Sequence, residues 1–329
     1  MIEIILGQLT SKAIKEKNIS FDDAARLYEK GQKEPFLLMA FASRIRQHYK
    51  PGAVSLCGIV NAKSGVCPEN CRFCAQSAHY HTNAPVYPLM SADEIGQLGR
   101  VAKGSGVHLF SIVTSGTKIS TPEEWKTIYQ SIASLREIGV NPCASLGMLD
   151  KETAQGLKRA GLYRYHHNLE TSRSFFSQIC SSHDYEEDVE TVRTAHACGL
   201  SVCSGGIIGL GETMYHRIEM ALTLRELNVD SIPINILDPI PGTPLEGANS
   251  LTPLEILLTI ALYRFILPDK DIKLCGGKEK NLRQLLPLAV VAGCSSLMTG
   301  NYLTTLGRNT TQDIEMISDL GLVTKFDGD

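Results

Sequence analysis

The sequence predicts an α/β protein, a TIM-type (βα)8 barrel preceded by an N-terminal helical extension. Short runs rich in apolar and β-branched residues alternate with amphipathic stretches at helical spacing, and no long linker separates them. Eight such strand-like runs occur, and eight strands are the number that closes a parallel barrel covered by helices. An open, partial barrel is the alternative interpretation.

The N-terminal extension is predicted to be helical. Residues 21–28 follow Ser20, a favourable helix N-cap, and residues 36–49 carry apolar side chains at helical spacing. Neither segment contains residues typical of a ligand site, so we expect a packing element that ends at Pro51 and Gly52. The chain is thus divided into an extension (1–50), a barrel (51–323) and a C-terminal tail (324–329).

The predicted barrel elements follow in order. The strands cover residues 54–61, 108–114, 142–146, 163–169, 201–208, 231–237, 272–275 and 296–302. The clearest helical patterns between them cover residues 122–138, 151–160, 185–198, 213–227 and 253–267. Gly209 and Gly211 lack the spacing of a dinucleotide-binding turn, so a Rossmann site is not expected.

Composition excludes several classes of partner. The formal charge of -3, from 32 basic and 35 acidic residues, gives no electrostatic footprint for nucleic acid or for an anionic membrane. No run approaches about 20 apolar residues, and the N-terminus lacks a basic leader. We therefore expect a cytoplasmic protein. Ten cysteines in a long cytoplasmic chain indicate metal or redox chemistry rather than disulfides.

Three of these cysteines, Cys67, Cys71 and Cys74, form a C-x3-C-x2-C run. Thiolates are soft ligands that suit iron–sulfur clusters and zinc. A structural zinc site uses four protein ligands, whereas three thiolates on a [4Fe–4S] cluster leave one iron open for a small molecule. A zinc knuckle, or a redox pair at Cys71 and Cys74, remains an alternative. Because the run follows the first predicted strand, it should lie at the C-terminal mouth of the barrel, where active sites collect.

The cysteine run, with Phe73 before its last member, resembles the signature of the radical S-adenosylmethionine (SAM) enzymes. Three further stretches resemble the biotin synthases in particular: residues 165–172 (YHHNLETS), 203–212 (CSGGIIGLGE) and 232–245, with IPIN at its start and GTPL at its end. Together they cover most of the chain between about residues 54 and 322. The hydrogenase-maturation and pyrrolysine-pathway radical enzymes have the same barrel, but we do not expect them to combine these motifs.

This resemblance implies a SAM site across the barrel mouth. It places Phe73 beside the adenine, Ser115 near the methionyl end, and Asn168 and Glu170 at the sugar and amino-acid groups. A carboxylate and an amide suit such hydroxyl and ammonium groups. Ile207 would offer an apolar surface to the adenine, although an isolated isoleucine in a strand is more often a core residue.

The resemblance also implies a site for dethiobiotin, whose ureido ring would be hydrogen-bonded by His166 and Asn235. For His166 a satisfied barrel histidine is the alternative. Where the family is expected to place an arginine for the SAM carboxylate, residues 185–188 read Tyr-Glu-Glu-Asp. An acidic side chain does not bind a carboxylate, and Arg193 is the candidate replacement.

Biotin synthases are expected to hold a second, [2Fe–2S] cluster deeper in the barrel on three cysteines and an arginine. Cys143 and Cys203 match two of those cysteines, but Ser111 and Lys273 stand at the other two positions. Serine is a poor substitute for thiolate at iron, and lysine must lose its proton to bind. The second cluster therefore needs other ligands in this chain.

Cys57 and Cys275 supply candidates, because with Cys143 and Cys203 they fall on the first, third, fifth and seventh predicted strands. Side chains from alternate strands fill a barrel in layers of four. We predict that these four cysteines hold an auxiliary cluster of the four-iron type, favoured over [2Fe–2S], with a possible extra sulfide as the donated sulfur. The cysteines on helical or connecting segments, namely Cys180, Cys198 and Cys294, are expected to be small hydrophobes.

The family resemblance implies a sulfurtransferase that converts dethiobiotin to biotin at the expense of SAM, through a 5′-deoxyadenosyl radical. Hydrogen-atom abstraction needs no general acid or base, so no catalytic residue beyond the cluster ligands is predicted. A low-potential donor such as flavodoxin or ferredoxin, and a homodimer, are expected from the family. The alternatives are a related barrel enzyme acting on another cofactor precursor, and an iron–sulfur electron carrier.

Overall fold

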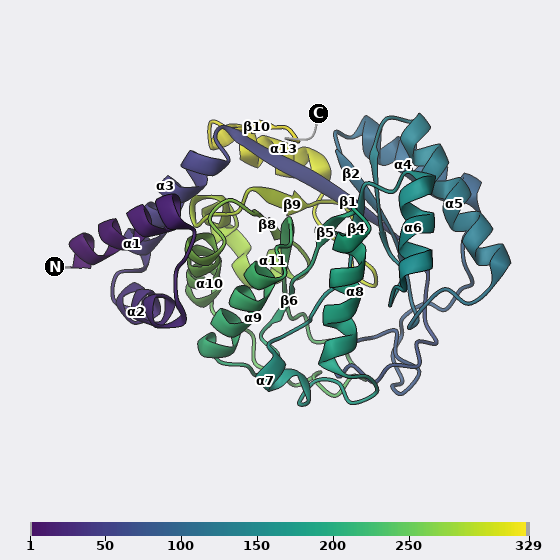
Figure 1. Ribbon diagram of the computed structural model, residues 1–329, viewed down its shortest axis with the longest axis horizontal. Coiled ribbons are helices and arrows are strands. Elements are labelled where there is room, and N and C mark those ends of the chain that lie inside the picture. The colour runs from purple at the N-terminus through teal and green to yellow at the C-terminus, as the bar shows by residue number, and fades with distance from the viewer. Residues whose placement is uncertain (1, 327–329) are drawn as a thin grey trace.

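The computed structural model describes residues 2–326 and contains a closed parallel barrel (Figure 1). Its strands pair in the order β1 (Ala53–Lys63), β2 (Leu109–Thr114), β3 (Asn141–Ser145), β4 (Arg164–His166), β5 (Ser201–Cys203), β7 (Ser231–Ile236), β8 (Asp271–Leu274) and β9 (Ser296–Met298). Pairing of β9 with β1 closes the barrel. The predicted (βα)8 fold is confirmed, and the open alternative is wrong.

The fifth barrel position is split, because β6 (Gly206–Ile208) continues the line of β5 along β7 after a short break. Pro233 lies in β7 opposite the break and has no N–H to donate. Gly205 fits only as glycine, since a Cβ there would lie 2.1 Å from the carbonyl oxygen of Pro233. The single strand predicted for residues 201–208 is therefore two.

Helices cover the outside of the barrel. The main ones are α4 (Ala92–Gly104), α5 (Pro122–Glu137), α6 (Lys151–Ala160), α8 (Tyr185–Ala197), α9 (Met214–Glu226) and α10 (Pro253–Ile266), with α13 (Thr310–Asp319) after the last barrel strand. Shorter ones are α7 (Arg173–Phe176), α11 (Lys278–Leu282), the 3-10 turn Arg283–Leu285 and α12 (Leu288–Val291). The five helices predicted after the cysteine run agree with α5, α6, α8, α9 and α10 to within a residue at each end.

The N-terminal extension forms α1 (Ile2–Glu16), α2 (Phe21–Gly31) and α3 (Pro35–Tyr49), and packs against α10 at one side of the barrel (Figure 1). Ser20 caps α2 by accepting from the Asp23 amide, as its sequence position predicts. Helix α1 was not predicted; its apolar side chains are buried in the same core. The extension thus lies outside the barrel mouth.

The C-terminal segment returns to the opposite, N-terminal end of the barrel. There β10 (Val323–Thr324) pairs with the first residues of β1, and the Lys325 amide donates to the carbonyl of Val54. Phe326 follows and is buried. Residues 327–329 of the predicted tail, like residue 1, lie outside the described residues. Within residues 2–326 no helix is long and apolar enough to cross a bilayer.

Arg264 fixes the connection between α10 and β8. Its side chain is fully buried and donates to the carbonyls of Gly293, Leu267, Pro268 and Lys270. Arg264 therefore anchors the turn that leads into β8, the strand that carries Lys273 and precedes Cys275.

Replacing Arg264 by methionine should destabilise the fold by about 3 kcal/mol or more, because several buried carbonyls lose their donor. Urea denaturation of the cluster-free protein measures this. Arg44→Met is the matched control, since Arg44 is exposed on α3 and should change stability by less than about 0.5 kcal/mol. Equal stability of both variants would contradict the anchoring role.

Candidate active site

A cavity of about 390 Å³ runs from the C-terminal mouth into the barrel. It brings together nearly all of the predicted site residues, although they come from different strands and loops. Those that line it are Cys57, Cys67, Phe73, Cys74, Ser115, Cys143, His166, Asn168, Glu170, Cys203, Ile207, Asn235 and Cys275. Ser111 and Lys273, which replace the expected family ligands, line it as well. Of the predicted residues, Cys71 and Arg193 do not line it.

The cysteine run forms a compact loop at the mouth. The Cys67 amide donates to the carbonyl of Gln76, the Ala78 amide donates to the carbonyl of Cys67, and the Cys74 amide donates to the carbonyl of Cys71. Burial and the neighbouring Cys67 raise the pKa of Cys74 to about 11. Three soft sulfur donors on one coiled loop fit an iron–sulfur cluster, with Cys67 and Cys74 facing the cavity.

A buried polar network ties this loop to the barrel. Glu69 contacts His183 (Oε2 to Nδ1, 2.8 Å), and the other ring nitrogen of His183 lies 3.2 Å from Asp188 on α8. Asp188 also contacts His167, the residue that follows β4, at 2.8 Å. Hydrogen bonding to Asp188 is the main reason that the pKa of His183 rises to about 11. A charged His183 between two carboxylates holds the loop over the cavity.

Sequence reasoning missed this network and the position of Cys180. Cys180 is buried, as predicted for a small hydrophobe, but its sulfur has polar neighbours. It lies 3.7 Å from the sulfur of Cys71 and 3.4 Å from Nδ1 of His183. The ligand atoms of Glu69, Cys180 and His183 all lie within 4.8 Å of one another. No local motif signals this, because more than a hundred residues separate Glu69 from the other two.

The residues expected at SAM occupy one wall of the cavity. Asn168 donates to Glu170 at 3.2 Å, while its buried carbonyl oxygen has no hydrogen-bond partner among the described residues. Such an orphaned acceptor suits a ligand that donates hydrogen bonds. Glu170 has a positive φ of 60°, and its carbonyl accepts from the Ile207 amide. Burial raises the pKa of Glu170 to about 7.

The other SAM candidates also face the cavity. Phe73 and Ile207 belong to one apolar cluster with Leu210 and Leu237, and both line the cavity. The Ser115 hydroxyl is buried and donates to the carbonyl of Gly65 at 2.8 Å. It therefore holds the loop after β1 in place at the edge of the cavity.

The two predicted substrate residues lie on neighbouring parts of the barrel wall. Asn235 on β7 donates to the carbonyl of Gly206 and accepts from the Gly276 amide at 3.1 Å, so its orientation is fixed. His166 on β4 is half-buried. Its imidazole also helps to lower the pKa of Cys203, so His166 is close to the deeper cysteines.

Strand register decides which side chains share a layer below the mouth. Cys57 on β1 pairs with Leu109 on β2, and Leu109 pairs with Asn141 on β3. Cys143 is two residues beyond Asn141, which makes it the next inward-facing position on β3. The strands of a closed barrel are tilted, and a level ring climbs by one such position at every second strand.

Followed around the barrel, this ring contains Cys57, Cys143, Cys203 and Lys273. Cys275 lies one inward-facing position above Lys273, just past the end of β8. The expected ring of four cysteines is thus three cysteines and a lysine. The fourth cysteine is placed above them, in the same cavity.

Lys273 brings a buried charge among these sulfurs, with its Nζ 4.0 Å from the sulfur of Cys203. Burial alone would lower the pKa of Lys273, but electrostatic interaction with Cys203 and Cys57 outweighs it and raises the pKa above its usual range. Burial would likewise raise the pKa of Cys203, yet Lys273 and His166 bring it down to about 6. Lys273 acts as a counter-ion to thiolates in this arrangement.

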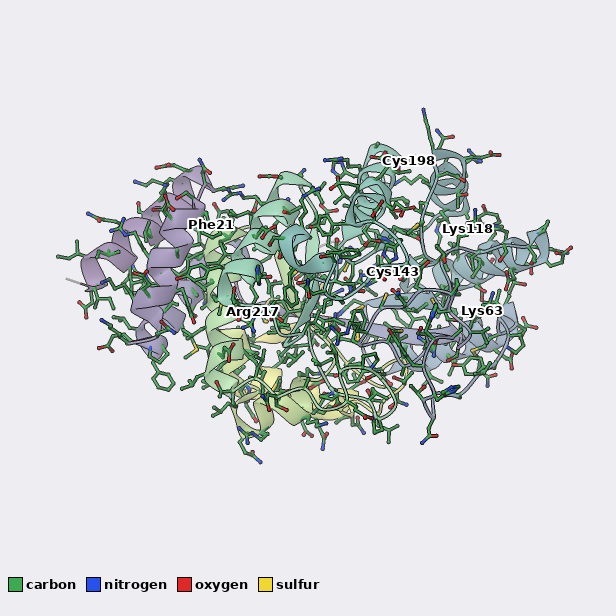
Figure 2. The ribbon with its side chains drawn as sticks, turned by 90° about the horizontal axis from the view of Figure 1, so that it is seen from below. Phe21, Lys63, Lys118, Cys143, Cys198 and Arg217 are labelled. Carbon is green, nitrogen blue, oxygen red and sulfur yellow. The ribbon has the colours of Figure 1, made fainter. Side chains whose placement is uncertain are left out.

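Two expectations for single residues need correction. Arg193 does not reach the cavity: its side chain is more than half exposed on α8 and lies near Glu190. It therefore does not reach a carboxylate bound at the mouth. Cys198, which was expected to be a small hydrophobe, is the C-cap of α8 and is only half-buried. Cys143, in contrast, lies inside the barrel (Figure 2).

Comparison with known proteins agrees with this geometry. The model of the radical SAM superfamily matches residues 62–236, and that of the Biotin and Thiamin Synthesis associated domain matches residues 233–323. Biotin synthase from Geobacter sulfurreducens is 55% identical over 318 residues, 96% of this chain and 97% of the relative. Biotin synthase from Pelobacter propionicus is 54% identical, over 94% and 95% of the two chains. The chain belongs to the biotin synthase family.

Solved structures share the fold at lower identity. Methylornithine synthase (PylB) has a TM-score of 0.83 at 21% identity, covering 97% of this chain and 98% of its own. The hydrogenase maturase HydG from Carboxydothermus hydrogenoformans has a TM-score of 0.80 at 16% identity, over 98% and 79% of the two chains. These likenesses establish the barrel architecture.

Glu170→Gln should stabilise the cluster-free protein at about pH 8 by roughly 2 kcal/mol and have little effect near pH 5. The pKa of Glu170 is raised in the folded protein, to about 7, so its contribution to stability is present at low pH and lost as the pH rises through that value. Urea denaturation at the two pH values measures the difference. Exposed Glu190→Gln is the control, and the same pH dependence there would contradict the prediction.

Proposed function

We propose that this protein converts dethiobiotin to biotin by radical SAM chemistry, with the sulfur drawn from an auxiliary cluster inside the barrel. The observation that carries the proposal is the continuity of one cavity. It joins Cys67 and Cys74 at the mouth to Cys57, Cys143 and Cys203 below, with room between them for a small molecule. A radical source and a sulfur source on either side of one substrate is the arrangement that sulfur insertion needs.

At the mouth, Cys67, Cys71 and Cys74 would hold a [4Fe–4S] cluster. When bound, this cluster supplies the electron that cleaves SAM. Asn168 and Glu170 would then bind polar groups of SAM, and Phe73 and Ile207 would contact its adenine. The Glu69–His183–Asp188 network would keep the cysteine loop closed over the site and exclude water from it.

Below the mouth, Cys57, Cys143, Cys203 and Cys275 would hold the auxiliary cluster, for which we favour a four-iron type over [2Fe–2S]. It supplies the sulfur atom when bound. Three of these sulfurs approach from one ring, and Cys275 approaches from the position above it. Lys273 would balance the thiolate charge, since a buried cation next to Cys203 stabilises the ionised sulfur.

The remaining wall would position the substrate. His166 and the fixed amide of Asn235 lie between the two sets of cysteines and would hydrogen-bond the ureido ring of dethiobiotin. Electrons would come from a low-potential protein such as flavodoxin or ferredoxin.

Mössbauer spectra and an anaerobic iron count test the auxiliary ligands. The double variant Cys57→Ser, Cys275→Ser should lose about four iron atoms per chain and keep the [4Fe–4S] signal of the mouth. The matched control is Cys198→Ser, Cys294→Ser, which should lose none. Lys273→Met should also retain the iron if lysine is not a ligand. Loss of the cluster in Lys273→Met, with retention in the double variant, would refute this ligand set.

Turnover of dethiobiotin tests the reaction itself. Reconstituted protein with SAM and a strong reductant should form 5′-deoxyadenosine and biotin. Asn235→Ala should raise the dethiobiotin concentration needed for half-maximal rate about tenfold, because a fixed hydrogen-bonding group is lost. 5′-Deoxyadenosine without biotin would instead indicate a related radical enzyme. Neither product would indicate an electron carrier.

A further inference from the structure

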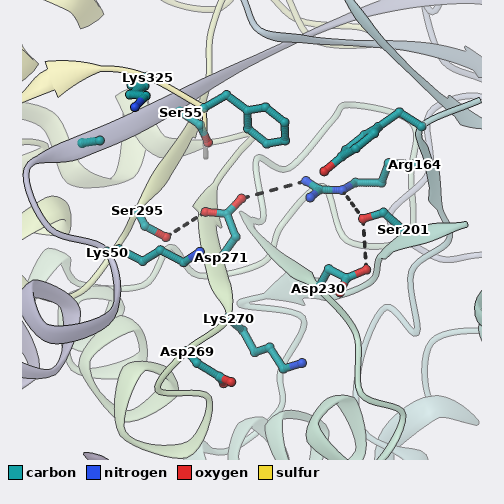
Figure 3. A pocket seen from close by; sticks show the side chains of 13 residues that line it. Lys50, Ser55, Arg164, Ser201, Asp230, Asp269, Lys270, Asp271, Ser295 and Lys325 are labelled. Carbon is teal, nitrogen blue, oxygen red and sulfur yellow. Dashed lines mark hydrogen bonds and ion pairs between the residues drawn. The ribbon is translucent and has the colours of Figure 1, made fainter. Parts of the chain in front are cut away.

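A second cavity of about 390 Å³ lies at the N-terminal end of the barrel, opposite the mouth (Figure 3). We call it the basal cavity. Its lining is strongly polar, with the basic side chains Lys50, Arg164, Lys270 and Lys325, the carboxylates Asp230, Asp269 and Asp271, and the hydroxyls of Ser55, Ser201 and Ser295. None of these residues was singled out from the sequence, and the proposed reaction at the mouth uses none of them.

Arg164 borders both cavities. Its Nε donates to Ser201 at 2.9 Å, and its Nη1 is 4.0 Å from Asp271. Nη1 is buried and makes no hydrogen bond within the described part of the chain. A guanidinium that is only 5% exposed, and whose Nη1 makes no hydrogen bond to the described residues, lies between the two cavities and can bind an anion.

The carboxylates of the basal cavity, in contrast, have donors within the protein. Asp230 accepts from the Ser201 hydroxyl and the Val202 amide, at 3.0 and 2.8 Å. Asp271 accepts from Ser295 at 2.7 Å. Asp269, on the rim, pairs with Lys17 of α1 at 2.8 Å. The acceptors are thus engaged by the fold, and the open donor of Arg164 is left for a ligand.

Phe326 and Tyr163 complete the floor between the two cavities. The ring of Phe326 packs against Cys57, Leu109 and Cys143, and so touches two of the deeper cysteines from below. Its edge meets the ring of Tyr163 at a centroid separation of 5.6 Å, and Arg164 lies against both rings. Two residue pairs join β10 to β1, and the amides of Val323 and Lys325 donate to the carbonyls of Gly52 and Val54.

We propose that the basal cavity binds hydrosulfide and supplies it to the deeper cysteines through the floor formed by Tyr163, Arg164 and Phe326. The proposal rests on the proposed function in one respect, that iron is held at those cysteines and loses sulfide in each reaction. At the iron held by the deeper cysteines, hydrosulfide would replace the lost sulfide and release one proton to water in the basal cavity. No electron is transferred, so no oxidant or reductant is required.

This route has a physical advantage over supply through the mouth. SAM and dethiobiotin would fill the central cavity above the auxiliary cysteines, and sulfide from that side could enter only after they had left. From below, a small anion has to pass one guanidinium and two aromatic rings. Arg164 lowers the cost of bringing a negative charge into the barrel, since a buried ion needs a partner of opposite charge.

Isotope exchange tests the route. The full-length protein, anaerobically reconstituted and saturated with SAM and dethiobiotin but without reductant, is incubated with sodium sulfide that carries a heavy sulfur isotope. Label in the acid-labile sulfide is then followed by mass spectrometry. The Cys57→Ser, Cys275→Ser variant is expected to lack the auxiliary cluster. Its exchange therefore reports the mouth cluster alone and is subtracted.

Phe326→Ala should accelerate exchange at the auxiliary site about tenfold by opening the floor, while Phe326→Leu, which keeps an apolar plug, should exchange near the native rate. Arg164→Gln should raise the half-saturating sulfide concentration about tenfold, because the cation is lost. Leu303→Ala, which opens the mouth instead, should leave the rate unchanged. Retained cleavage of SAM by each variant, measured separately, shows that the barrel is intact.

Acceleration by Leu303→Ala and a native rate in Phe326→Ala would overturn the basal route and leave the proposed reaction standing. A native protein that binds no iron at the deeper cysteines would overturn the proposed auxiliary site, and the basal route with it. If Arg164→Gln left the half-saturating sulfide concentration unchanged, Arg164 would not be the group that binds hydrosulfide.

Discussion

Closure of the tilted barrel is the constraint on which the rest of the structure depends. Closure sets the register between strands, and register sets which inward-facing side chains form a ring. Cys57, Cys143 and Cys203 come from strands far apart in sequence, yet they meet because each occupies the same level of one closed sheet. The barrel axis also separates a mouth from a base, so two cavities can approach the deeper cysteines from opposite ends.

Charge inside this barrel is placed where it can be balanced. Lys273 lies among thiols, Arg164 lies beneath them, and His183 lies between Glu69 and Asp188. Isolated buried charges are costly, and each of these has partners of opposite charge or groups that ionise beside it. The same partners fix the positions of the cysteine loop and of β4 and β8. Electrostatics therefore contributes to the geometry of the site as well as to its chemistry.

Membership of the biotin synthase family is compatible with a serine and a lysine at two of the expected ligand positions. A chain 55% identical to one relative over nearly its whole length keeps the barrel and the mouth motif. In the interior, Ser111 and Lys273 stand at the two positions where the family resemblance implies other ligands, and Cys57 and Cys275 face the same cavity. Inward-facing side chains set the chemistry of the cavity, while the barrel itself is compatible with many such sets.

The sequence by itself determined the barrel and the residues of the mouth. Strand–helix alternation predicted the fold because it reflects local periodicity, and the cysteine run was readable because its ligands are adjacent in the chain. Tertiary structure alone decided the rest. Register placed Lys273 in the ring and Cys275 above it, and folding brought Cys180 and His183 to Glu69. It also brought Phe326, from the end of the chain, beneath Cys57 and Cys143. Such contacts join residues that are distant in sequence, and no local pattern encodes the closure that brings them together.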